Sequence, residues 1–211
     1  MKLNAVQWVF LASVFLAMSS ADAATPPPIN VKFINKAEDV TGFWDDSIRA
    51  DFVEAMNLVA NNVSAAWRNG QPVTIGSKGG MRLIVVDHPL YIGKSQVGGY
   101  HSTGSTGPYA IIDLTVALQQ EGPGGPYLFG SHEVAEMLVD PSVNRFAHGV
   151  FMEVADPVVC CHYDLTLSDA SVVPVSDFVL PTWFTPNSIG PYDFVASPYI
   201  QAPFQLGPGG Y

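Results

Sequence analysis

The apolar and polar positions of the N-terminal half follow two different periods. Residues 29–34 alternate apolar with polar side chains, which predicts a strand with one face buried. From Thr41 to Trp67 the apolar residues recur at steps of three, four or five, which predicts a long helix. Asp45 and Asp46 lie in its expected first turn, where carboxylates favour the helix dipole.

Further strands follow this helix. Residues 72–75 and 81–86 read as strands joined by a glycine-rich turn at 76–80, and the second is apolar enough for the middle of a sheet. A loop rich in Gly, Ser and Thr is expected over 93–107, and another strand over 109–114.

A second helix and an irregular region complete the pattern. The helix is predicted over 127–139 and ends at Asp140–Pro141, because proline disfavours helical geometry at the residue before it. Short strands are expected over 150–154 and 172–180. Beyond Pro181 the coil is rich in proline and too apolar for a free tail, so we expect it to wrap and seal the core. Its aromatic residues include Trp183, Phe184, Tyr192, Phe194, Tyr199 and Phe204.

The first 23 residues predict a secretory signal. Lys2 supplies a positive start, an apolar run follows from Ala5 to Met18, and Ala21 and Ala23 occupy the positions that a signal peptidase reads. An uncleaved membrane anchor is the alternative, but the run is short for a span. We therefore expect residues 24–211 to form one domain, secreted or periplasmic, monomeric, and not held at a membrane once the signal is removed.

The composition of the whole chain limits its expected partners. The 211 residues are 48% hydrophobic and 13% charged, which is typical of a globular protein, and their formal net charge is -10. An acidic surface repels phosphates, so nucleic acid and anionic lipid are not expected partners.

The two cysteines, Cys160 and Cys161, are adjacent, so they do not form a disulfide scaffold. Free thiols, a strained vicinal disulfide and an intermolecular link all remain open. Metal binding by Cys160, Cys161 and His162 is a weaker alternative, because the paired spacing of structural zinc sites is absent.

The predicted second helix carries the chemistry. His132 and Glu136 are four residues apart, so a helix places both on one face, about one turn apart. An imidazole and a carboxylate that converge in this way can hold a metal ion, and the adjacent Glu133 can take a proton from water. The alternative is an ordinary amphipathic helix with solvated glutamates.

The order of elements and the His-Glu-x-x-Glu sequence resemble the N-terminal subdomain of zincin metallopeptidases, over residues 29–140. The resemblance implies an α+β fold, in which a twisted mixed sheet has a backing helix and an active-site helix. In the zincin pattern His-Glu-x-x-His, the histidines bind zinc and the glutamate is the general base. Here Glu136 stands where the second histidine belongs, which shifts metal preference toward harder ions. Zinc is the expected cofactor, with calcium or another divalent ion as alternatives.

The same resemblance suggests a third ligand. One zincin branch takes it from a downstream glutamate that a nearby aspartate supports, and Glu153 with Asp156 is similar to that pair. A charged turn without a ligand is the alternative, and His148 is the competing ligand, although it falls in an expected loop tip. Asp140 is a further candidate to support the ligands.

Tyr100 and His101 precede the strand that would bind extended substrate in a zincin. Either side chain could polarise an oxyanion. A mobile loop with a surface histidine is the interpretation that we favour for this segment.

The chain is also similar to little-characterised secreted and phage-encoded proteins, and distantly to exordium-like plant proteins. The first similarity rests on the Ser-His-Glu-x-x-Glu-x-x-x-Asp-Pro and Glu-Val-x-Asp sequences and on the terminal Gly-Gly-Tyr. These matches indicate the position of a site and no reaction.

We therefore expect an exported, metal-dependent hydrolase, and specifically a peptidase. His132, Glu136 and Glu153 would hold the ion, and Glu133 would activate water that attacks a peptide or protein substrate. The alternative is a secreted binding or structural module on a zincin-like scaffold, with a structural ion such as calcium or with none. A cell-wall-associated factor is a third and weaker alternative.

Overall fold

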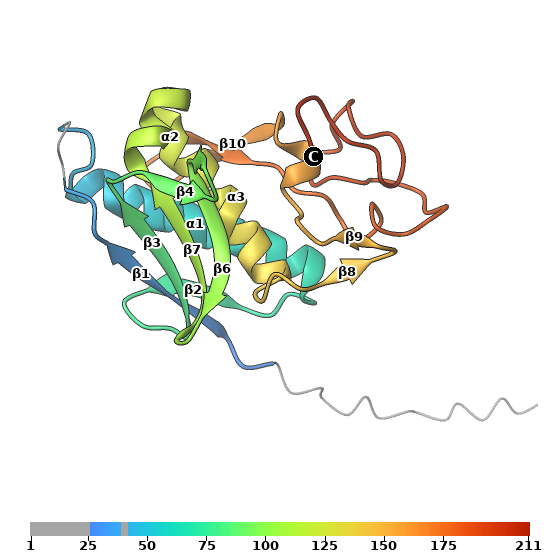
Figure 1. The fold of residues 1–211 in the computed structure, drawn as a ribbon, viewed down its shortest axis with the longest axis horizontal. Helices are drawn as coiled ribbons and strands as arrows, with labels where there is room; N and C mark the ends of the chain where they lie inside the picture. The colour runs from blue at the N-terminus through green and yellow to red at the C-terminus, as the bar shows by residue number, and fades with distance from the viewer. Residues whose placement is uncertain (1–25, 39–41) are drawn as a thin grey trace, which may run out of the picture.

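The computed structural model describes residues 26–38 and 42–211, so the expected signal peptide lies outside the described residues. A mixed sheet is covered on one face by two long helices, and an irregular C-terminal lobe lies beside them (Figure 1). The expected α+β class is confirmed at this level. Within the described ranges no helix is long and apolar enough to span a membrane.

The sheet has the strand order β2-β1-β3-β7-β6. Its strands are β1 (Ile29–Asn35), β2 (Val73–Gly76), β3 (Met81–Val86), β6 (Gly99–Gly104) and β7 (Gly107–Asp113). The first four in this order run parallel, whereas β6 pairs antiparallel with β7 and forms one edge. β2 and β6 are therefore the two edge strands of the sheet.

The two long helices are α1 (Asp46–Trp67) and α3 (Gly125–Val139). α1 begins later than its apolar period predicts, because the Asp45 carboxylate caps it by accepting from the amide of Ile48 at 2.9 Å. The helices pack closely at Gly130, where a Cβ atom would lie 2.7 Å from the ring of Phe52. Gly130 thus allows α3 to lie close to α1.

Several elements differ from the prediction. The expected loop over 93–107 is wrong, because it contains the short strand β5 (Ser95–Val97), all of β6 and the turn that leads into β7. α2 (Leu114–Glu121) was not expected, although its cap is a plain signal: Asp113 accepts from the amide of Thr115 at 2.9 Å. The remaining elements are β4 (Leu90–Ile92), β8 (Phe146–Ala147), β9 (Val150–Phe151), β10 (His162–Thr166), β11 (Val172–Ser176) and the 3-10 turns η1 (Gly122–Gly124) and η2 (Asp156–Val158).

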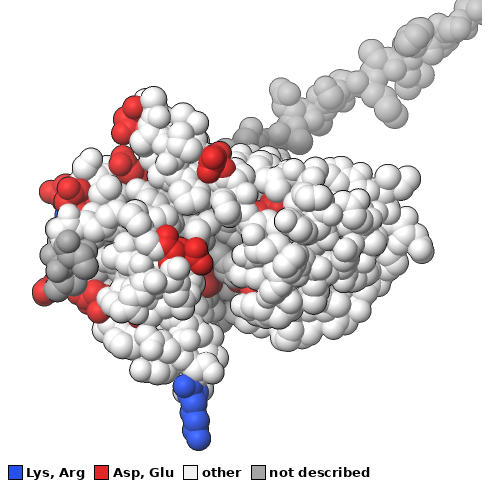
Figure 2. All heavy atoms as spheres, turned by 90° about the horizontal axis from the view of Figure 1, so that it is seen from above, with Lys and Arg blue, Asp and Glu red and all other residues white. Residues whose placement is uncertain are grey.

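The C-terminal region packs onto the end of α1. The indole of Trp67 donates to the carbonyl of Val179 at 3.0 Å, and its ring lies 5.7 Å from that of Phe184. Trp183 and Phe184 are buried in the same core as the helices, whereas Tyr199 is exposed. The irregular lobe therefore seals one end of the core, as expected. Its visible face carries almost no charge, in contrast to the acidic sheet-and-helix part (Figure 2).

A buried carboxyl pair, Asp177 and Asp193, lies inside this lobe. Asp193 accepts from the amide of Ser197 with both oxygens, at 3.0 and 3.1 Å. Asp177 accepts from the amide of Phe178 at 2.8 Å, while its second oxygen has no hydrogen-bond partner. Burial, together with the charge of Asp193, raises the pKa of Asp177 to about 7.

This pair predicts a pH-dependent stability. The folded protein keeps a proton on Asp177 that the unfolded chain releases above its ordinary pKa of about 3.9, so this carboxyl destabilises the fold increasingly as pH rises from about 4 to 7. Asp177→Asn is neutral and can keep the bond to Phe178. We expect it to raise the melting temperature by a few degrees at pH 8 and to change it little at pH 4, as measured by calorimetry.

Asp164→Asn, at an exposed position on β10, serves as the control and should be neutral at both values. A loss of stability in Asp177→Asn that is equal at pH 4 and pH 8 would contradict the assignment.

Candidate metal centre

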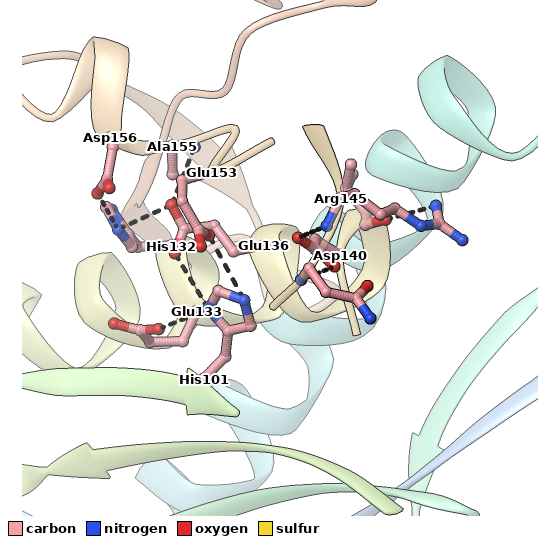
Figure 3. A network of polar contacts seen from close by, with 11 residues as sticks. His101, His132, Glu133, Glu136, Asp140, Arg145, Glu153, Ala155 and Asp156 are labelled. Atoms are coloured by element: carbon pink, nitrogen blue, oxygen red, sulfur yellow. Dashed lines mark hydrogen bonds and ion pairs between the residues drawn. The ribbon is translucent and has the colours of Figure 1, made fainter. Parts of the chain in front are cut away.

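α3 presents its polar side chains into a confined space. Most of the helix is buried, including Glu133 and Glu136. His132 and Glu136 share one face, as their spacing predicts, and Glu133 is turned toward β6 (Figure 3). The space that receives them is bounded by α3, the edge strand β6 and the segment that follows β9.

Three side chains form a first group of possible metal ligands: His132, Glu136 and Asp156. His132 Nε2 lies 3.3 Å from Glu136 Oε1 and 3.2 Å from Asp156 Oδ1. Glu136 Oε1 also accepts from the amide of Ala155 at 3.3 Å, which ties the segment after β9 to the helix.

His101 occupies the opposite side of Glu136. Its Nδ1 lies 3.3 Å from Glu136 Oε2 and 3.7 Å from Glu133 Oε2, and its Nε2 lies 3.4 Å from Glu153 Oε2. The favoured interpretation of a surface histidine on a mobile loop is wrong, because His101 is paired with Ala110 in the sheet and is only 9% exposed.

Tyr100 lies on the other face of the sheet, because successive residues of a strand point to opposite sides. It packs with Tyr109, whose ring centroid is 6.0 Å away, among the apolar residues of that face. The structure therefore brings His101 to the centre and leaves Tyr100 outside it.

The structure exchanges the expected positions of Glu153 and Asp156. Asp156, expected to support a ligand, contacts His132, whereas Glu153, expected as the third ligand, contacts His101. The competing His148 lies on the β8–β9 turn, with its ring 6.2 Å from that of Phe204. It belongs to neither group of ligand-type atoms among the described residues.

Asp140 stabilises the turn that follows α3. Its carboxylate accepts from the amides of Asn144 at 3.1 Å and Arg145 at 2.7 Å, which closes the turn after α3. The guanidinium of Arg145 donates to the carbonyl of Val139 at 2.7 Å, and that of Arg68 donates to Leu138 at 2.7 Å. These bonds satisfy the last carbonyls of the helix and direct the chain back over the centre.

The charges of the centre are strongly coupled. Burial would lower the pKa of His101, but the carboxylates of Glu133 and Glu136 outweigh it and raise the pKa to about 10. The pKa of His132 is also raised, because Glu136 and Asp156 outweigh its burial.

The pKa values of the carboxyl groups shift in different directions. Burial would raise the pKa of Glu136, yet the two histidines hold it well below its usual range. Burial and the charge of Glu136 raise the pKa of Glu153 to about 7, and burial also raises that of Glu133.

The donor set and its spacing fit a divalent cation. Ligand atoms about 2.0–2.1 Å from a tetrahedral ion lie about 3.3 Å from one another, close to the distances around His132 and Glu136. Two groups have ligand-type atoms within 4.8 Å of one another: His132, Glu136 and Asp156, and His101, Glu133 and Glu136. These buried groups could therefore hold a metal ion. The two cysteines are free and belong to neither group.

A cleft of about 470 Å³ opens beside the centre. Glu153 and Asp156 form part of its wall, and side chains of β9, η2 and the C-terminal lobe form an apolar wall. Tyr211 lies at this cleft, and partial burial together with Asp156 raises the pKa of its phenol. These segments lie far apart in the chain, so no local sequence pattern predicts that they form one cleft. The apolar wall consists of Val150, Phe151, Pro157, Trp183, Phe204 and Leu206.

Comparison of the chain with family models, with curated proteins and with solved structures gave no significant match. The chemistry of the centre therefore rests on its own geometry.

Binding of a divalent cation by His132, Glu136 and Asp156 should stabilise the folded protein. At a free Zn²⁺ concentration of about 100 times the Kd, binding to the folded state adds about 2.7 kcal/mol, or about 5–10 °C in Tm for a domain of this size. The rise should be larger at pH 8 than at pH 6, because the cation must displace the proton held by His132.

Calorimetry of chelator-treated protein with and without Zn²⁺ measures this shift. His132→Ala should reduce it clearly, and His88→Ala, at a side chain that is 65% exposed, should leave it unchanged. An equal shift in all three proteins would place the ion elsewhere.

Proposed function

We propose that the protein is an exported metal-dependent hydrolase, and specifically a peptidase with a zincin-like arrangement of sheet and helices. The observation that carries the proposal is the convergence of His132, Glu136 and Asp156, with Glu133 buried beside them. Export rests on the sequence of the first 23 residues.

The donor set favours zinc over calcium. Calcium takes oxygen ligands, whereas imidazole nitrogen suits zinc and similar transition metals, and His132 supplies such a nitrogen to the group. His132, Glu136 and Asp156 would hold the ion. When bound, the ion would polarise the carbonyl of a substrate and lower the pKa of water.

Glu133 is suited to accept a proton. It is 6% exposed, its Oε2 atom has no hydrogen-bond partner, and burial raises its pKa. A carboxylate with a raised pKa is a stronger base than a solvated one and can take a proton from the attacking water. Gly99 makes room for it, because a Cβ atom there would lie 3.0 Å from the Cγ and Oε1 atoms of Glu133.

Two features support a peptide or protein substrate. β6 is an edge strand, so its free side can pair with an extended chain, and its residue His101 reaches the centre. The cleft beside Glu153 and Asp156 has an apolar wall that suits a bulky apolar side chain.

The test is Glu133→Gln, which removes the proton acceptor and keeps the shape of the side chain. We expect hydrolysis of a mixed peptide pool to fall by about 10²–10⁴-fold, while an ion remains bound at His132. Elemental analysis and mass spectrometry of the peptide products measure the two quantities separately.

Glu121→Gln, at an exposed position at the end of α2, is the control and should keep full activity. Full activity in Glu133→Gln with the ion retained would refute the mechanism. Calcium or no ion in the wild type, without chelator-sensitive hydrolysis, would favour a non-catalytic binding module instead.

A further inference from the structure

Glu136 faces a different histidine with each of its oxygens. Oε1 lies 3.3 Å from His132 Nε2, and Oε2 lies 3.3 Å from His101 Nδ1. Each histidine has a second carboxylate oxygen near the same nitrogen: Asp156 Oδ1 at 3.2 Å from His132 and Glu133 Oε2 at 3.7 Å from His101. The centre therefore consists of two groups of similar composition that share one carboxylate.

The second group consists of His101, Glu133 and Glu136, and its polar atoms are not all hydrogen-bonded. Glu133 Oε2 is buried and has no hydrogen-bond partner, whereas His101 Nε2 and Glu153 Oε2 face each other at 3.4 Å. Glu133 is 6% exposed, so its free oxygen is aimed into the protein interior rather than at solvent. A buried carboxylate oxygen without a partner is costly and indicates a bound group beside it.

Protonation of His101 would satisfy only some of the carboxylate oxygens around it. Its Nδ1 atom carries a single N–H, whereas oxygens of both Glu133 and Glu136 lie within 3.7 Å of that nitrogen. A divalent cation would take the Nδ1 atom of His101 together with one oxygen each from Glu133 and Glu136. Their contact distances of 3.3 and 3.7 Å are close to the ligand separation of about 3.3 Å at a tetrahedral ion.

We propose that the centre binds two divalent cations that share Glu136. The first is the ion of the proposed function, at His132, Glu136 and Asp156, and the second is bound by His101, Glu133 and Glu136. This extends the proposed function and rests on it for the first ion only.

The second position explains why Glu153 is present but does not reach His132. Its Oε2 atom lies 3.4 Å from His101 Nε2, the nitrogen that would not bind the ion. A carboxylate at this nitrogen accepts its N–H, fixes the tautomer and orients the ring for metal binding through Nδ1. Glu153 is thus a positioning residue for the second ion.

Occupancy of the second position changes the part played by Glu133. With one ion bound, Glu133 is free to accept a proton. With two ions bound, its Oε2 atom becomes a ligand. The stoichiometry of binding therefore decides how a substitution at Glu133 is to be understood.

The experiment counts ions on the full-length mature protein. Chelator-treated protein is titrated with Zn²⁺ alone by calorimetry at pH 7.5, and the product is analysed for zinc after removal of the free ion. We expect two ions per chain in the wild type, one in His101→Gln and one in His132→Gln. Tyr100→Phe, on the opposite face of β6, should keep two.

A second readout does not depend on the variants. With Co²⁺ in place of Zn²⁺, the paramagnetic resonance signal per ion should be weaker in the doubly loaded wild type than in the singly loaded protein, because a shared carboxylate couples the two ions.

The outcomes separate the two proposals. One ion in the wild type, or unchanged binding in His101→Gln, would overturn the second position and leave the proposed function intact. No ion in the wild type would overturn both.

Discussion

The carboxylate of Glu136 is the interaction on which the centre depends. It joins α3, which carries it, to two segments that are distant in sequence: β6 through His101, and the segment after β9 through the amide of Ala155. Its side chain is 5% exposed, so it cannot rely on water for its charge. Removal of one partner from a buried ion pair costs about 3–5 kcal/mol, because the remaining charge is left uncompensated. Glu136 therefore fixes how closely the three segments approach.

The fold supplies that interaction by holding α3 rigidly at its sides and at its C-terminal end. Gly130 lets α1 approach closely, and the guanidinium groups of Arg68 and Arg145 satisfy the carbonyls at the C-terminal end. Asp140 then turns the chain by accepting from two backbone amides. The result is that Glu153 and Asp156 return over the helix at a defined height. Residues without any charge contact to the centre thus determine its geometry.

The local part of this arrangement could be predicted, and the non-local part could not. His132 and Glu136 meet because a helix places residues four apart on one face, and the apolar pattern around them predicts that helix. Glycine and serine obscure the strand period around His101, so the sequence predicts a loop there. The burial of His101 follows from pairing with Ala110, which no local pattern encodes. The choice between Glu153 and Asp156 depends likewise on the bond from Ala155 to Glu136, formed across 19 residues.

The centre can exist with protons or with cations because the two satisfy the same charges. His101 and His132 have raised pKa values and can hold protons that offset the acidic groups around Glu136. A divalent cation at either histidine replaces such a proton with a larger charge. The apolar core runs from the sheet through α1 and α3 to Trp183, independently of these groups. A scaffold with that core should remain folded when ligands are substituted, so a loss of bound ion reports on the ligands themselves and not on unfolding.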